Sequence, residues 1–186
     1  MFYYNKRIYK GKSLIEKVCD YTVVDIETTS LDSYYGKILE ISAVKVRNNK
    51  VVDTFSELID VNEEIGYFTT RLTGITTKMV LKEGKDLIKG LESFLEFFEN
   101  DIIIGHNVNF DIDFLYDSIK DNLGLYLSND YIDTLRLSRK YLKELKHHKL
   151  DDLINYYNLE IRDKHRALND CILTNQVYVE LSKQIK

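Results

Sequence analysis

The chain has 186 residues, of which 44% are hydrophobic and 30% charged, with no proline and only two cysteines. This length suits one domain with a complete core, and the composition is that of an ordinary globular protein. A net charge of −4 argues against a protein that grips nucleic acid by its own positive charge, although bound divalent cations would supply that charge. No apolar run approaches the ~20 residues that span a bilayer, so we expect no membrane partner and a cytoplasmic location.

A short apolar strand with two carboxylates at its end opens the predicted domain. Residues 1–20 are polar, basic and aromatic, and we interpret them as an N-terminal extension of a single domain at residues 21–186. Segment 21–26 is β-branched and apolar, which predicts a buried strand. Side chains two apart on a strand point the same way, so Asp25 and Glu27 project together from its end. The two carboxylates repel each other, and burial makes the repulsion costlier, so their placement near a core needs a physical reason.

The remaining segments predict a β-meander followed by alternating strands and helices. Two alternating runs at 38–60 flank "RNNK" and predict a hairpin. The later elements are a short helical turn and loop at 69–80, helices at 86–99 and 109–124, a strand at 101–107, a strand that turns helical near Thr134, a short helix at 149–158 and a last helix from about 166. Asn109 is the expected N-cap of its helix and Gly124 the expected end. This order predicts an α/β domain whose mixed sheet is flanked by helices.

Two further carboxylates lie on surfaces that are otherwise apolar. On a helical wheel Asp113 and Asp117 fall on the polar side, where we expect solvated charges, whereas Asp111 falls inside the apolar sector. A first-turn aspartate favoured by the helix dipole is an equal alternative for Asp111 taken alone. Asp170 sits at the margin of the buried stripe of the last helix, and His165 falls in the loop before it.

The shared position of these acids predicts a metal site. Asp25, Glu27, Asp111 and Asp170 each lie at the end of a strand or the start of a helix, on a surface that faces the core. Hard divalent cations with oxygen ligands would relieve the repulsion, and two ions about 3.5–4 Å apart are the usual arrangement for displacement at phosphorus. The sequence therefore predicts that these four carboxylates bind two divalent cations, Mg²⁺ or Mn²⁺.

Three motifs carry a resemblance to a known family. They are "DIET" with Asp25 and Glu27, "HNVNFDIDFL" with Asp111, and "HRALNDC", in which His165 and Asp170 have the spacing H-x4-D. In this order they resemble the exonuclease motifs of the DEDD superfamily of 3′–5′ exonucleases, in the subgroup that uses histidine. The resemblance covers about residues 20–182. It is strongest to the epsilon proofreading subunit of DNA polymerase III and to the exonuclease domain of the Gram-positive replicative polymerase.

The resemblance implies a fold, an activity and a set of roles. The fold is ribonuclease H-like, and the activity is the release of 5′-mononucleotides from single-stranded DNA 3′ ends. Asp25, Glu27 and Asp170 would hold one metal ion, Asp25 would bridge to a second, and Asp111 would support that second ion. His165 would act as general base, which an ordinary histidine pKa near 6.5 suits. The implied substrate-binding residues are Thr28, Thr29, Leu31, Thr73, Ile75 and His165.

The sequence departs from the family pattern at one position, and it leaves two alternative functions open. The epsilon subunit has His-Gly-Ile where this chain has Thr73-Gly74-Ile75, so we expect altered nucleotide contacts and retained activity. An exoribonuclease on the same scaffold would read the 2′-hydroxyl through a few contacts that the sequence does not place. A non-catalytic module that binds nucleic acid or docks to a polymerase is the third hypothesis, against which the complete set of carboxylates with His165 argues. The protein partner that the resemblance implies is a DNA polymerase catalytic subunit.

Overall fold

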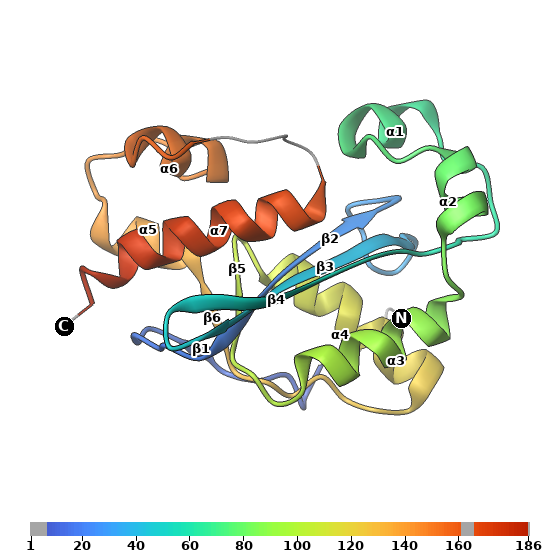
Figure 1. The fold of residues 1–186 in the computed structure, drawn as a ribbon, viewed down its shortest axis with the longest axis horizontal. Coiled ribbons are helices and arrows are strands. Elements are labelled where there is room, and N and C mark those ends of the chain that lie inside the picture. Colours follow the sequence, from blue (N-terminus) through green and yellow to red (C-terminus); the bar gives the residue numbers. More distant parts are fainter. Residues whose placement is uncertain (1–6, 161–165, 186) are drawn as a thin grey trace, which may run out of the picture.

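The computed structural model describes residues 7–160 and 166–185, which form an α/β fold around one mixed sheet (Figure 1). The strand order is β1-β6-β5-β2-β3-β4. Strands β2, β3 and β4 form an antiparallel meander, whereas β5, β6 and β1 continue the sheet in parallel from β2. The strands are β1 (Ser13–Leu14), β2 (Tyr21–Thr28), β3 (Ile38–Arg47), β4 (Lys50–Leu58), β5 (Ile103–Gly105) and β6 (Tyr131–Asp133).

Helices cover both faces of the sheet. In Figure 1, α7 crosses one face with α5 and α6 on its outer side, and α3 and α4 cover the opposite face. The helices are α1 (Tyr67–Thr73), α2 (Thr77–Glu83), α3 (Leu87–Phe98), α4 (Asn109–Leu123), α5 (Thr134–Tyr141), α6 (Leu150–Tyr156) and α7 (Ala167–Ser182). In the part of the chain that the structure describes, no helix is both long and apolar enough to cross a membrane.

Strand β2 contributes to two separate cores because its side chains alternate between the faces. Val24 and Ile26 pack in a cluster with residues of α3 and α4, such as Phe94. Tyr21 and Val23 pack in another cluster with residues of α5, α6 and α7. Asp25 and Glu27 share the side of Tyr21 and Val23, so the two acids continue this second apolar stripe toward the end of the strand.

A hairpin turn and two helix ends form where the sequence predicts them. Asn48 and Asn49 have φ angles of 50° and 59°, as the tight turn of the β3–β4 hairpin requires. Gly124 ends α4 with a φ of 67°. At the predicted change from strand to helix near Thr134, the side chain of Asp133 accepts a hydrogen bond from the N–H of Leu135 and caps α5.

Other local predictions are wrong, and each has a physical reason. The segment around 69–80 forms two helices, because Gly74 ends α1 in the left-handed region and the Thr76 side chain caps α2. Asn109 lies inside α4, and its side-chain oxygen accepts hydrogen bonds from Lys10 and Tyr131 in place of capping the helix. Local features, Gly74 and the Thr76 cap, decide the first outcome, whereas contacts with residues distant in sequence decide the second.

The N-terminal extension contributes a strand that the sequence did not reveal. Ser13 and Leu14 pair in parallel with Tyr131 and Ile132, so β1 forms the edge of the sheet beside β6. Two residues carry too little pattern to predict a strand, and only the exposed edge of β6 gives them hydrogen-bonding partners.

Gly105 leads from β5 toward α4, and its lack of a side chain is a packing requirement. An added Cβ would lie 2.8 Å from the Cβ of Val108 and 3.1 Å from the carbonyl oxygen of Val24. We therefore expect Gly105→Ala to lower the free energy of unfolding by about 1–3 kcal/mol, measured by urea denaturation. Gly66→Ala is the matched control, because nothing lies within 4 Å of its added Cβ and its φ is −62°. Equal stability of the two variants would contradict this account.

Candidate active site: carboxylates at the end of strand β2

Three of the predicted metal ligands meet in space. Asp25 and Glu27 come from β2 and Asp170 from the first turn of α7, and each offers a carboxylate oxygen within 4.8 Å of the other two. All three side chains are partly exposed. A register irregularity follows Glu27, where Thr28 pairs with Ile38, so the strand bends directly after the acids. Hard divalent cations prefer such a set of carboxylate oxygens, so the residues fit the predicted metal.

An open cavity of about 280 Å³ contains these acids. Its lining residues are Asp25, Ile26, Glu27, Leu72, His106, Asn107, Phe110, Asp111 and Asp170. Asp111 reaches the cavity from α4 on the opposite face of the sheet. Its carboxyl is only 4% exposed and accepts a hydrogen bond of 3.1 Å from the N–H of Ile26. The acid in the apolar sector is therefore buried beneath the end of β2.

A fifth acid, close to these four, was not predicted. Glu40 on β3 is fully buried and lies directly opposite Glu27 in the strand register. Its carboxylate accepts a hydrogen bond of 2.7 Å from the Nη2 of Arg166 and one of 3.3 Å from the N–H of Ala167. The pair fixes the start of α7 to β3, and Asp170 lies one turn further along. A single acid inside the apolar run "ILEISAV" is the signal that could have revealed it.

The predicted substrate loop after β2 is held by its own hydrogen bonds. The Thr28 hydroxyl donates to the carbonyl of Ser30 at 2.7 Å, and the Thr29 hydroxyl accepts from the N–H of Lys37 at 2.9 Å. Leu31 is 84% exposed. The roles of Thr28, Thr29 and Leu31 in binding substrate stay predictions.

The other two predicted substrate contacts lie in the interior. Thr73 and Ile75 are 1% and 0% exposed, and Ile75 packs against Leu39 and Val80. Neither side chain presents a surface to a nucleotide, because the turn after α1 folds both inward. Leu72, which directly precedes them, is 67% exposed and lines the cavity instead. The roles of Thr73 and Ile75 in binding substrate stay predictions.

His106 and Asn107 also line the cavity. The predicted general base, His165, lies outside the described residues. His106 lines the cavity, and its Nδ1 lies 2.9 Å from the hydroxyl oxygen of Thr134, as a histidine packed near the end of a strand would. The neighbouring Asn107 donates its N–H to the carboxylate of Asp133, which ties this wall to the start of α5.

Comparison with known proteins decides the family. A family model described as "Exonuclease" matches residues 22–178. The chain belongs to this exonuclease family. It is 36% identical over 179 residues to the DNA polymerase III PolC-type of Caldanaerobacter subterraneus subsp. tengcongensis, and 39% identical over 166 residues to that of Thermotoga maritima. These matches cover 96% and 89% of this chain but only 13% and 12% of the relatives, so the chain corresponds to about one-eighth of their length.

Solved structures share the fold of this exonuclease chain. E. coli Exonuclease I in complex with a dA16 oligonucleotide has a TM-score of 0.76 at 15% identity, over 90% of this chain and 41% of that one. Exonuclease X in complex with 5′ overhanging duplex DNA has a TM-score of 0.67 at 22% identity, over 89% and 96%. The predicted exonuclease family and the ribonuclease H-like α/β fold are confirmed, and the members of this family are metal-dependent hydrolytic nucleases.

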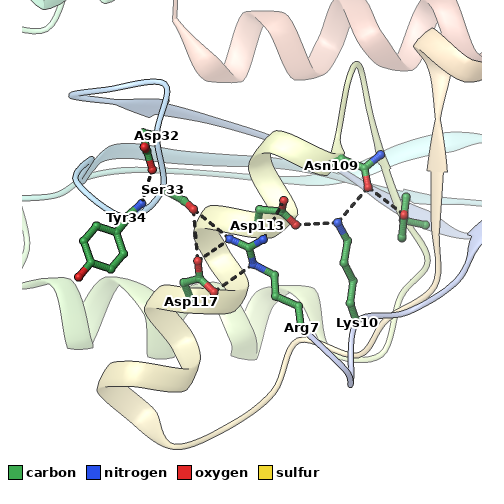
Figure 2. Close-up of polar contacts among 9 residues, drawn as sticks. Arg7, Lys10, Asp32, Ser33, Tyr34, Asn109, Asp113 and Asp117 are labelled. Carbon is green, nitrogen blue, oxygen red and sulfur yellow. Dashed lines mark hydrogen bonds and ion pairs between the residues drawn. The ribbon is translucent and has the colours of Figure 1, made fainter. Parts of the chain in front are cut away.

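The N-terminal segment of this exonuclease is tied to the loop beside the cavity (Figure 2). Arg7 forms an ion pair of 2.6 Å with Asp117 and donates to the hydroxyl of Ser33 at 2.9 Å. It also lies 3.1 Å from Asp113, which pairs with Lys10 at 2.7 Å. The prediction that Asp113 and Asp117 are simply solvated is wrong, because cations distant in sequence reach them. Arg7 thereby joins α4 to the loop between β2 and β3.

Burial and mutual repulsion raise the pKa values of the acids. Loss of solvent is the main cause for Asp25, whose pKa rises well above its ordinary value, and the charges of Asp111 and Glu27 add to it. Burial and then the charge of Asp170 raise the pKa of Glu27 to about 7. Burial raises the pKa of Asp111 to about 8, although the hydrogen bond from Ile26 opposes the rise. Without a cation, the site holds protons near neutral pH.

These shifts make the metal-free protein less stable as pH rises. The folded protein holds the Asp111 proton up to about pH 8, whereas the unfolded chain releases it near the ordinary value of 3.8. Stability from this group is therefore present below about pH 4 and is lost as the pH rises toward 8. We expect Asp111→Asn to raise the metal-free unfolding free energy near pH 8 by about 1–3 kcal/mol, and by little near pH 4. Urea denaturation with chelator at both pH values measures the difference.

Asp113→Asn on the same helix is the matched control. It removes an acid that pairs with Arg7 and Lys10 and relieves no buried repulsion, so it should not stabilise the protein at either pH. A loss of stability in Asp111→Asn near pH 8 would show that the Asp111 charge is tolerated without metal.

Proposed function

We propose that this chain is a 3′–5′ exonuclease that uses two divalent cations, Mg²⁺ or Mn²⁺, to release 5′-mononucleotides from single-stranded DNA. The observation that carries the proposal is the convergence of Asp25, Glu27 and Asp170 within 4.8 Å in an open cavity, with Asp111 in the same cavity. The sequence similarity to PolC-type polymerases supports DNA over RNA and a DNA polymerase as partner. With that partner the enzyme would remove misincorporated nucleotides, and it would act in the cytoplasm.

Each side chain has a definite task in this mechanism. Asp25, Glu27 and Asp170 would hold one cation, and Asp25 and Asp111 would take part in holding the second. The bound cations supply Lewis acidity toward the phosphate and a lowered pKa for the attacking water. His165 accepts the proton of that water as general base. Thr28 and Thr29 meet the terminal 3′-hydroxyl, while Leu31 and Leu72 contact the terminal base.

The direction and the substrate can be tested in one experiment. Single-stranded DNA and RNA of matched sequence, labelled at the 5′ end, are incubated with Mg²⁺, Mn²⁺ or chelator. We expect the labelled DNA to shorten stepwise with either metal and to remain intact with chelator. Asp25→Asn should lose at least about 10–100-fold in rate, because it removes a ligand, whereas Asp53→Asn on the exposed side of β4 should not.

Two outcomes would contradict the proposal. Early release of the label as a mononucleotide would mean attack from the 5′ end. Degradation of the RNA with the DNA left intact would favour the exoribonuclease alternative.

A second prediction separates the general base from the ligands. His165→Ala should lose about 10²–10⁴-fold in rate and keep the rise in melting temperature that Mn²⁺ causes, because His165 holds no metal. Asp170→Ala should lose both. The rate should increase with pH through the pKa of the histidine, and higher pH should partly rescue His165→Ala. Near-normal turnover of a destabilised His165→Ala protein would remove this residue from the mechanism.

A further inference from the structure

The outer face of helix α1 carries large side chains that no described part of the chain covers. Tyr67, Phe68 and Leu72 are 72%, 82% and 67% exposed, and Arg71 is exposed beside them. Residues four apart are neighbours on a helix, so the pairs 67/71 and 68/72 make one continuous surface. Thr73 is the buried residue of this helix. The usual amphipathic arrangement is thus reversed on α1, which points to a binding role for the surface.

This surface is continuous with the carboxylate cavity. Leu72 belongs to the surface and also lines the cavity that contains Asp25 and Asp170. In Figure 1, α1 stands over the end of β2, across from the first turn of α7. The cavity is open, and its volume of about 280 Å³ is near the lower end of the range for ligand sites. A strand whose 3′ end lies in the cavity must leave across its rim, and α1 is part of that rim.

The chemistry of the surface suits a single strand of nucleic acid. The rings of Tyr67 and Phe68 meet edge to face, with centroids 5.7 Å apart and an interplanar angle of 73°, so they do not stack on each other. At 72% and 82% exposure, both residues keep ring surface open to solvent. Aromatic faces that stack on bases, combined with an arginine that meets phosphate, are the usual means of binding single strands without sequence preference. The surface needs no sequence preference if successive nucleotides pass over it.

We propose that the α1 face, formed by Tyr67, Phe68, Arg71 and Leu72, binds the nucleotides that precede the 3′-terminal nucleotide of a single strand. The two rings stack on bases and Arg71 pairs with a phosphate. The inference rests on the proposed function, and it adds a second site outside the cavity. A substrate that fills only the cavity should therefore be insensitive to changes at Tyr67, Phe68 and Arg71, which do not line the cavity.

A pair of matched double variants tests the stacking. Tyr67→Leu/Phe68→Leu keeps an apolar helix and removes both rings, whereas Tyr67→Phe/Phe68→Tyr keeps two rings. The readouts are fluorescence anisotropy of a labelled single-stranded oligonucleotide in Ca²⁺, and KM and kcat for that oligonucleotide and for p-nitrophenyl thymidine 5′-monophosphate in Mn²⁺. We expect the leucine variant to weaken oligonucleotide binding and raise its KM about 5- to 100-fold. The small substrate should be unaffected, and the ring-preserving variant should resemble wild type.

The charge on the face has its own test. Arg71→Gln should reduce the slope of log binding constant against log salt by about 0.7, the value for one phosphate contact on a single strand. Lys50→Gln, an exposed cation at the β3–β4 hairpin, is the matched control and should leave the slope unchanged. Leu125→Ala, which alters a side chain that is 53% exposed between α4 and β6, controls for the loss of an exposed apolar group.

The outcomes separate the inference from the proposed function. If the leucine variant binds the oligonucleotide and has a KM like the wild type, the inference is overturned and the exonuclease proposal stays intact. The face would then be a docking surface for a protein or for a second copy of the chain, because such an apolar surface accepts leucine. An equal loss on both substrates would mean that the change disturbs the cavity, and would also overturn it. Wild-type protein that cleaves neither substrate would count against the exonuclease proposal, while the anisotropy would still decide whether the face binds a strand.

Discussion

The fold gathers several carboxylates at one end of β2, and the rest of the structure has to overcome the repulsion among them. Asp25, Glu27 and Asp170 lie within 4.8 Å of one another, and Asp111 lies buried just beneath. Burial, and after it the nearness of like charges, favours the protonated forms, which is why the pKa values of Glu27 and Asp111 rise to about 7 and 8. Packing elsewhere in the domain must hold these groups together, because their own interactions drive them apart. A cation in the site removes that opposition, so metal binding and stability are coupled.

The sheet supplies this support from both of its faces. Strand β2 lies between one core built with α3 and α4 and another built with α5, α6 and α7. Because the strand alternates, it presents Asp25 and Glu27 to α7 while its own N–H at Ile26 binds the carboxylate of Asp111 from α4. The ion pair of Glu40 with Arg166 then fixes the start of α7 against β3. The acids are therefore positioned by contacts that lie outside the cavity.

Segments distant in sequence shape the surroundings of the site. Arg7 ties the N-terminal segment to α4 and to the loop after β2, and α1 closes another side with Leu72. On the loop, Tyr34 and Tyr35 are 84% and 75% exposed. In the proposed function, bound cations would supply the positive charge toward an anionic substrate that a chain with a net charge of −4 lacks.

The sequence by itself determined the elements whose cause is local. The period of two in β2 put Asp25 and Glu27 on one side, and the helical period put Asp111 among apolar residues and Asp170 at the margin of a buried stripe. Tertiary structure alone decided which distant groups meet these acids, because such contacts depend on strand register and helix packing. Glu40 lies opposite Glu27 only once β2 and β3 are paired, and Arg7 reaches Asp117 across 110 residues of chain. Likewise, only the turn after α1 decided that Ile75 points inward and Leu72 faces the cavity, since both are apolar and three positions apart.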